Sequence, residues 1–208
     1  MRVLVACEFS GTVRDSFIKR GHDAWSCDLD GVEPEGEFLD NHIKGDCLEV
    51  ISDNWDLIIA HPPCTYLTNA GARWLYDERY PNRKQHREQA AEFFMKLYNA
   101  PSPRVAVENP VGYMSKAFRK PDQIVRPYEY GHNATKATCL WLRGLPKLSP
   151  TNVIEPVPHT SKSGRKWCKW FFDSSLISDL KERSKFRNRT FQGIADAMAD
   201  QWGRVEEV

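Results

Sequence analysis

Long hydrophobic runs are absent from the 208 residues of this chain. No run reaches the roughly 18 apolar residues of a transmembrane helix, and the first residues lack the basic and apolar regions of a secretory signal. The six cysteines are not arranged as the CxxC pairs typical of structural zinc sites. We therefore expect a reduced protein of the cytoplasm that uses no metal and does not associate with membranes.

An excess of charge of one sign is also missing. Lys and Arg total 29 and Asp and Glu total 28, which leaves a net charge of +1. A nucleic-acid surface must therefore come from local clusters of basic residues, because the whole chain has no basic field. The length suits one domain of about 150 to 200 residues, so we predict one domain over residues 1–208.

Short apolar runs alternate with helical patterns, which is typical of a parallel sheet covered by helices. The predicted strands are 3–7, 24–27, 56–60, 104–107 and 138–142, and the predicted helices are 12–19, 85–98 and 190–202. Open α/β sheets bind ligands at the carboxyl ends of their strands, so we expect each of the five strands to end at a binding edge. Segments 69–84 and 146–187 interrupt the pattern and are interpreted as insertions into one core.

Cys64 follows a buried strand and the proline pair Pro62-Pro63. Two prolines restrict the backbone, so the thiol is presented in a rigid loop at the carboxyl end of the strand. It is either a nucleophile or a buried structural cysteine. Glu108 ends another apolar strand, and buried carboxyl groups of this kind often have raised pKa values suited to proton transfer. A helix-capping role for Glu108 is the alternative.

The first strand leads into Gly11 at the start of a helix, and Asp28 ends the second strand. A glycine turn lets a ligand approach backbone amides, and an acid about twenty residues later can hold a ribose diol. The segment contains neither GxGxxG nor a Walker lysine, which argues against nicotinamide dinucleotides and nucleoside triphosphates.

In this order, the segments resemble those of the DNA cytosine carbon-5 methyltransferases. The similar segments are Phe9-Ser10-Gly11, Asp28-Leu29, Gly45-Asp46-Cys47, Pro62-Pro63-Cys64, Glu108-Asn109, Tyr130-Gly131 and the final helix from Gly193. The resemblance spans nearly the whole chain. It implies a Rossmann-like methyltransferase fold, with a mostly parallel sheet and helices on both faces.

The resemblance further implies that S-adenosylmethionine is the cofactor. The residues expected to bind it are Phe9, Ser10, Gly11, Thr12, Asp28, Leu29, Asp46, Cys47 and Pro62. It also implies that Cys64 adds to carbon 6 of cytosine while Glu108 protonates ring nitrogen 3. Amino-group methyltransferases carry Asp, Asn or Ser before the proline pair and an aromatic residue after it. His61 and Cys64 stand there, which argues against adenine methylation.

The chain departs from the family after Tyr130-Gly131, where the family's Gln, first Arg and second Arg fall on Ala134, Lys136 and Thr138. Lys136 is expected to keep part of the base or phosphate contact, which Thr138 cannot make. The other departure is size, because 146–187 stands in place of a target-recognition domain. Residues expected to contact nucleic acid are Arg73, Arg79, Arg83, Lys84, Lys162, Arg165, Lys166 and Lys169.

The sequence thus favours methylation of cytosine at carbon 5 in single- or double-stranded DNA. The compact build is similar to that of a phage or mobile-element enzyme, acting in a bacterial or phage-infected cell. A catalytically silent DNA-binding or decoy module on the same fold is one alternative. An enzyme acting on RNA, a free nucleotide or a modified base is another. A homodimer or a partner protein stays open as the source of specificity.

Overall fold

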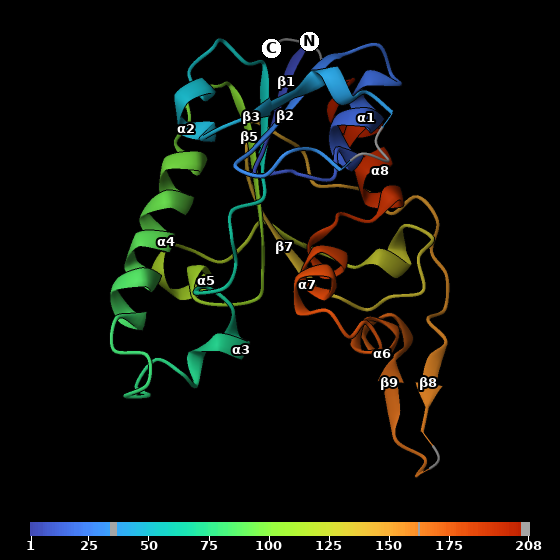
Figure 1. Cartoon of the computed structure of the whole chain (residues 1–208). Helices are drawn as coiled ribbons and strands as arrows, with labels where there is room; N and C mark the ends of the chain where they lie inside the picture. Colours follow the sequence, from blue (N-terminus) through green and yellow to red (C-terminus); the bar gives the residue numbers. More distant parts are fainter. Residues whose placement is uncertain (34–36, 162, 205–208) are drawn as a thin grey trace.

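The computed structural model describes residues 1–33, 37–161 and 163–204 of the chain. Its main feature is a sheet of seven strands in the order β3-β2-β1-β4-β5-β7-β6 (Figure 1). The strands are β1 (Arg2–Ala6), β2 (Asp23–Asp28), β3 (His42–Lys44), β4 (Leu57–Ala60), β5 (Arg104–Pro110), β6 (Gln123–Val125) and β7 (Thr138–Arg143). The five strands β1 to β5 pair in parallel, and β7 runs antiparallel to both of its neighbours.

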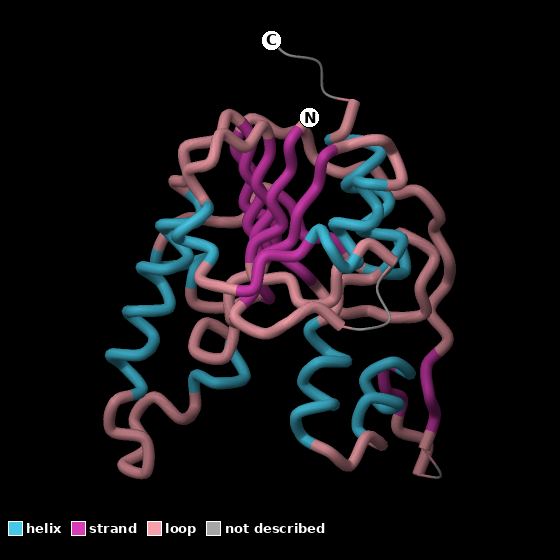
Figure 2. The backbone as a smooth tube through the Cα atoms, turned by 45° about the horizontal axis from the view of Figure 1, so that its top comes forward, coloured by secondary structure: helices cyan, strands magenta, loops and turns pink. Residues whose placement is uncertain are grey.

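Helices cover both faces of this sheet, which confirms the predicted fold class (Figure 2). The α-helices are α1 (Thr12–Ile18), α2 (Cys47–Val50), α3 (Asn69–Ala72), α4 (Arg83–Tyr98), α5 (Met114–Ala117), α6 (Lys169–Ser175), α7 (Leu180–Asn188) and α8 (Gln192–Trp202). Two 3₁₀ turns, η1 and η2, span Leu39–Asn41 and Pro127–Glu129. No helix within the described residues is long and apolar enough to cross a membrane.

Side chains along β1 alternate between two apolar layers, as the two-residue period of a strand requires. Val3 and Val5 face one layer, to which α1 and α8 contribute Phe17 and Trp202. Leu4 and Ala6 face the other layer, which includes side chains of α4. The four residues from Val3 to Ala6 are fully buried, so a continuous apolar run marks a strand covered on both faces.

The direction of β7 corrects one expectation. We predicted that residues 138–142 would end at the binding edge, and this is wrong because β7 is antiparallel to β5. Thr138, the first residue of β7, pairs with Pro110, the last residue of β5. The segment that precedes β7 therefore lies at that edge. The sequence pattern also missed β3 and β6, because three residues are too few to show a period.

The segment between β7 and α8 contains α6, α7 and a second, two-stranded sheet. Its strands, β8 (Pro158–Thr160) and β9 (Lys166–Cys168), pair antiparallel with each other. In Figure 1, α6, α7, β8 and β9 lie below the carboxyl ends of the parallel strands, on the same side as α8. The segment predicted to take the place of a target-recognition domain thus has secondary structure of its own.

Truncation of Phe94 tests the packing of α4. Phe94 is fully buried, and its ring meets that of Trp141 edge-on at 5.1 Å between centroids. Phe94→Ala should lower the free energy of unfolding by about 3 to 5 kcal/mol, through lost burial and the cavity left behind. Phe94→Leu should lower the free energy of unfolding less than Phe94→Ala does. Leu176→Ala, at a residue that is 69% exposed, should leave the free energy of unfolding nearly unchanged. Urea unfolding measures all three, and a loss below 1 kcal/mol in Phe94→Ala would contradict this packing.

Candidate active site

A cleft of about 730 Å³ opens where the parallel strands end. Its floor is built from five short segments at the carboxyl edge of the sheet: Cys7 with Phe9; Asp28 with Asp30; His61 to Thr65; Glu108 to Pro110; and Thr135 with Lys136. Residues of the inserted segment complete it: Cys168, Trp170, Phe171, Lys181, Ser184, Lys185, Arg187 and Asn188. The sheet therefore brings together residues that are far apart in the sequence.

The Cys64 loop is held against the end of β5. The buried side chain of Asn109 donates a hydrogen bond from Nδ2 to the Pro62 carbonyl oxygen at 2.9 Å. The Cys64 carbonyl oxygen accepts from the backbone nitrogens of Leu67, at 2.9 Å, and Thr68, at 3.0 Å. These bonds close a turn immediately after the proline pair. The Asn109 bond also joins the loop to the strand that carries Glu108.

Cys64 is half-buried at the floor of the cleft. Burial raises the pKa of its thiol, the negative charge of Glu108 raises it further, and the positive charge of Lys136 opposes both. The free protein therefore keeps the Cys64 thiol protonated at neutral pH. This cysteine has to lose its proton before its sulfur can attack a substrate.

Glu108 has a lowered pKa, opposite to our expectation. Burial alone would raise the pKa of this carboxyl, but a hydrogen bond with His61, the charge of Lys136 and a hydrogen bond with Thr138 outweigh burial. The His61 Nδ1 and Glu108 Oε2 atoms are 3.3 Å apart. The expectation was wrong because the sequence does not show which groups surround the end of β5. Glu108 is therefore ionised at neutral pH.

Lys136 reaches the cleft from the segment before β7. Its Nζ donates to the Arg187 carbonyl oxygen at 2.9 Å and lies 5.9 Å from the centre of the Trp170 ring. Ala134 is buried, and the nearly buried Thr138 contributes to the Glu108 environment. Of the three positions compared with the family's Gln, Arg and Arg, Lys136 is thus the one that lines the cleft.

Phe9 and Asp28 line another part of the cleft, where β1 and β2 end. Asp28 is half-buried, which raises its pKa, and its Oδ1 accepts from the Asp30 backbone nitrogen at 3.0 Å. Cys7 lies beside them, with its Sγ 3.8 Å from that of the buried Cys47. A carboxylate next to an aromatic ring suits the ribose diol and the apolar surface of a nucleoside. This end of the cleft fits S-adenosylmethionine.

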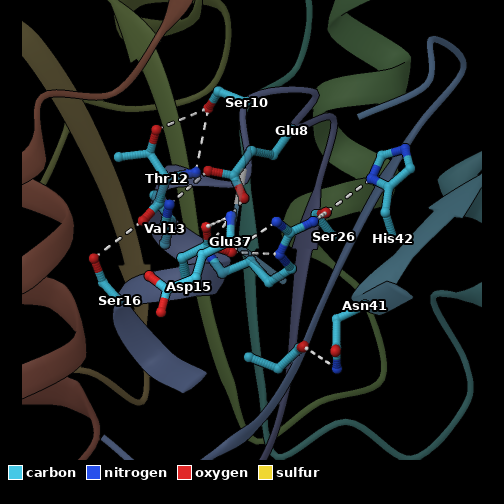
Figure 3. A network of polar contacts seen from close by, with 12 residues as sticks. Glu8, Ser10, Thr12, Val13, Asp15, Ser16, Ser26, Glu37, Asn41 and His42 are labelled. Carbon is cyan, nitrogen blue, oxygen red and sulfur yellow. Dashed lines mark hydrogen bonds and ion pairs between the residues drawn. The ribbon is translucent and has the colours of Figure 1, made fainter. Parts of the chain in front are cut away.

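The loop between β1 and α1 is fastened by its own polar groups (Figure 3). The buried Glu8 carboxylate accepts from the backbone nitrogens of Val13, at 2.7 Å, and Arg14, at 3.2 Å. This replaces a side-chain cap at Gly11, whose φ of 70° is in the left-handed region. Ser10 Oγ accepts from Thr12 Oγ1 at 3.1 Å. The described cleft lining includes Phe9 but not Ser10, Gly11 or Thr12.

Of the other residues predicted to bind the cofactor, Pro62 is part of the described cleft lining, whereas Leu29 and Asp46 are not. Leu29 is 73% exposed. The Asp46 carboxylate accepts from the Leu48 backbone nitrogen at 2.9 Å and so caps α2.

The basic residues after Cys64 interact within their own segment. Their partners are the Trp74 ring for Arg73, the Asp77 carboxylate for Arg79, the Gly71 carbonyl oxygen for Arg83 and the Tyr76 ring for Lys84. In the inserted segment, Arg165 lies over Trp167, Lys169 pairs with Asp173, and Lys166 is exposed on β9. Lys162 lies outside the described residues. The structure thus gives most of these side chains a partner within the chain.

Several lining residues were not predicted as site residues. They include His61, Asn109, Trp170 and the two lysines of α7, Lys181 and Lys185. His61 directly precedes the Pro62-Pro63-Cys64 motif and Asn109 belongs to the Glu108-Asn109 motif, so these positions are the signal that could have identified them. The lysines of α7 have no comparable signal, because only the folding of the inserted segment brings them over the cleft.

No protein-family model and no curated protein matches this chain. Among solved structures, a protein described as a candidate DNA modification methyltransferase from an E. coli prophage is 16% identical, with a TM-score of 0.47, over 76% of this chain and 52% of its own. Entamoeba histolytica methyltransferase EhMeth is 15% identical, with a TM-score of 0.47, over 74% of this chain and 57% of its own. S. pombe Dnmt2 methyltransferase is 15% identical, with a TM-score of 0.41, over 71% of this chain and 50% of its own.

All three structures are named as methyltransferases, the class of enzyme that the sequence motifs resemble. This chain spans about half the length of the proteins it matches. At such low identity the likeness concerns the fold alone. The activity of this chain has to be argued from its own residues.

Removal of the Glu108 charge should make Cys64 more acidic. Glu108→Gln takes away a negative charge that raises the thiol pKa, so the pH midpoint for alkylation of Cys64 should fall by about half a unit to one unit. Iodoacetamide labelling across pH 6 to 10, read by peptide mass spectrometry, measures this midpoint. Glu92→Gln, at an exposed position on α4, is the control and should leave the midpoint unchanged. An unchanged or higher midpoint in Glu108→Gln would show that Glu108 does not act on the thiol.

Proposed function

We propose that this chain transfers a methyl group from S-adenosylmethionine to carbon 5 of cytosine in DNA, through a covalent bond to Cys64. The observation that supports it is the placement of the Cys64 thiol and the Glu108 carboxylate in one cleft whose other end carries Phe9 and Asp28. A volume of about 730 Å³ is in the usual range for a small-molecule site. One cleft can therefore hold a nucleoside cofactor beside a base.

The protonation of the two groups suggests how the first step proceeds. Cys64 holds a proton because burial and the charge of Glu108 raise its pKa, whereas Glu108 is ionised because His61, Lys136 and Thr138 together outweigh its burial. Glu108 takes the proton from the Cys64 sulfur, which then bonds to carbon 6, and Glu108 passes this proton to ring nitrogen 3. The S–H group is thus added across carbon 6 and nitrogen 3, and carbon 5 becomes an enamine carbon.

The second step places the methyl group on carbon 5. S-adenosylmethionine would supply this group, and Asp28 and Phe9 are the lining residues that would hold its ribose and its apolar surface. After transfer, a base removes the proton from carbon 5, the bond between carbon 6 and sulfur breaks, and nitrogen 3 returns its proton. The net change is replacement of one proton by a methyl group, and Cys64 regains its hydrogen.

Substrate contacts are proposed for the basic and aromatic residues around the cleft. Lys136 can reach the base or a phosphate, and Trp170 offers a ring for stacking. The target base has to leave its stack to reach Cys64, and single-stranded DNA lowers that cost. We place the reaction in the cytoplasm of a bacterial or phage-infected cell. Because the family's arginine contacts are missing, two alternative hypotheses remain: a silent DNA-binding or decoy module, and an enzyme acting on RNA, a free nucleotide or a modified base.

A mechanism-based inhibitor tests the nucleophile. An oligonucleotide containing 5-fluorocytosine should form a stable bond with Cys64 when cofactor is present, because the fluorine on carbon 5 cannot leave as a proton does. A denaturing gel should show a shifted band with the unmodified protein. The band should be absent in Cys64→Ser and at least tenfold weaker in Glu108→Gln, because nitrogen 3 then receives no proton.

Cys168→Ser is the matched control, since this second thiol also lines the cleft and should leave the band unchanged. A shifted band that persists in Cys64→Ser would overturn the assignment of the nucleophile.

Mass spectrometry of nucleosides from cells expressing the protein gives the second test. If no DNA substrate crosslinks and no 5-methylcytosine accumulates although the cofactor binds, the silent module becomes the better hypothesis.

The cofactor end of the cleft can be tested without turnover. Asp28→Ala should weaken binding of S-adenosylmethionine by about 1 to 3 kcal/mol, the usual cost of losing a hydrogen bond to a charged group. Isothermal titration calorimetry measures this loss. Asp40→Ala, at an exposed residue of η1, should bind like the unmodified protein. Equal affinity in Asp28→Ala and Asp40→Ala would place the ribose elsewhere.

A further inference from the structure

His61 lies beside Glu108 because of the register of the parallel strands. Ala6 on β1, Ala60 on β4 and Val107 on β5 are aligned side by side. The residues that follow the last two are His61 and Glu108, which are 47 positions apart in the sequence. The His61 backbone nitrogen also donates to the Ala6 carbonyl oxygen at 2.9 Å. The backbone thus holds the imidazole at the mouth of β4.

The contact between His61 and Glu108 is enclosed. Nδ1 of the ring is 3.3 Å from Oε2 of the carboxylate, and the two side chains are 11% and 20% exposed. An ionised carboxylate can only accept a hydrogen bond, so we assign the ring hydrogen to Nδ1. The other ring nitrogen, Nε2, is buried and has no hydrogen-bond partner among the described residues.

Other polar groups surround this pair from each neighbouring element. Glu8 follows β1, but its carboxylate accepts from the first turn of α1. Lys136 and Thr138 act on Glu108 from the segment at the start of β7, and Cys64 lies in the loop after β4. Arg189, next to the same pair in a void of about 20 Å³, is paired with Glu33 at 2.7 Å. Of these groups, His61 is the one whose ring nitrogen Nδ1 lies within hydrogen-bond distance of Oε2 of Glu108, at 3.3 Å.

We infer that His61 is a positioning residue for Glu108. By donating its Nδ1 hydrogen to Oε2, it holds the carboxylate ionised and in place beside Cys64. This inference rests on the proposed function, since it assigns the step that the ionised carboxylate performs. The S–H bond of Cys64 breaks, its proton moves to the Glu108 carboxylate, the sulfur bonds to carbon 6, and the proton passes to ring nitrogen 3. His61 gains and loses no proton in this sequence.

Substitutions of His61 should separate this role from simple packing. Asn can place an amide N–H group near the position of Nδ1, whereas Leu has a similar size and no donor. Gln extends its amide toward the position of Nε2 instead, so it serves as a second variant without the Nδ1 donor if His61→Leu does not fold. Each variant is first checked for cofactor binding by calorimetry, because none of them alters Phe9 or Asp28.

The first readout is the pH dependence of crosslinking to the 5-fluorocytosine oligonucleotide. The reaction needs ionised Glu108, so its rate falls at low pH as this carboxyl takes up a proton. Loss of the donor destabilises the ionised form and raises the pKa, and the acidic limb should therefore move up by about one pH unit in His61→Leu and His61→Gln. His61→Asn should keep the limb near its original position. A lower rate with an unmoved acidic limb in His61→Leu or His61→Gln would overturn the inference.

The second readout does not depend on catalysis. Carbon-13 NMR of protein labelled at the glutamate carboxyl carbons, with Glu108→Gln for assignment, reports the titration of Glu108 directly. The midpoint should rise in His61→Leu and His61→Gln and stay near the original value in His61→Asn. An unchanged midpoint in the first two variants overturns the inference, whatever the crosslinking shows. Failure of the unmodified protein to crosslink, with the expected NMR shifts present, would instead overturn the proposed function and leave the His61–Glu108 coupling standing.

Discussion

The in-register pairing of β1, β4 and β5 is the constraint on which the candidate active site depends. Parallel strands end at one edge, and Ala6, Ala60 and Val107 are aligned across that edge. The next residues along each strand therefore meet at one place: Cys7, His61 and Glu108. A shift of one residue in this register would turn every side chain of the shifted strand to the other face and separate the pair.

Burial of Glu108 sets the electrostatics of the cleft. A carboxylate away from water is costly unless donors and opposite charge surround it, and His61, Thr138 and Lys136 supply both. The same negative charge makes the neighbouring thiol harder to ionise. One arrangement thus explains two opposite pKa shifts, and in the free protein it leaves the proton on Cys64 and not on Glu108.

The inserted segment is joined to this centre rather than separate from it. Lys136 donates to the Arg187 carbonyl oxygen, and Arg187 in turn donates from Nε to Ser174 Oγ at 2.9 Å. Trp170 stacks on Phe186 and also contacts Phe191, the residue before α8. The side chains that cover the cleft are therefore tied both to the segment before β7 and to the last helix.

Local patterns in the sequence were enough for the strands with buried apolar runs, the three longest helices of the sheet layers and the loop at the carboxyl end of β4 that carries Cys64. Each of these depends on neighbouring residues, such as the proline pair before the thiol. The antiparallel direction of β7 and the lowered pKa of Glu108 were decided by tertiary structure. His61 and Glu108 show the reason: they are separated by 47 positions, and only the pairing of β4 with β5 brings their side chains into contact.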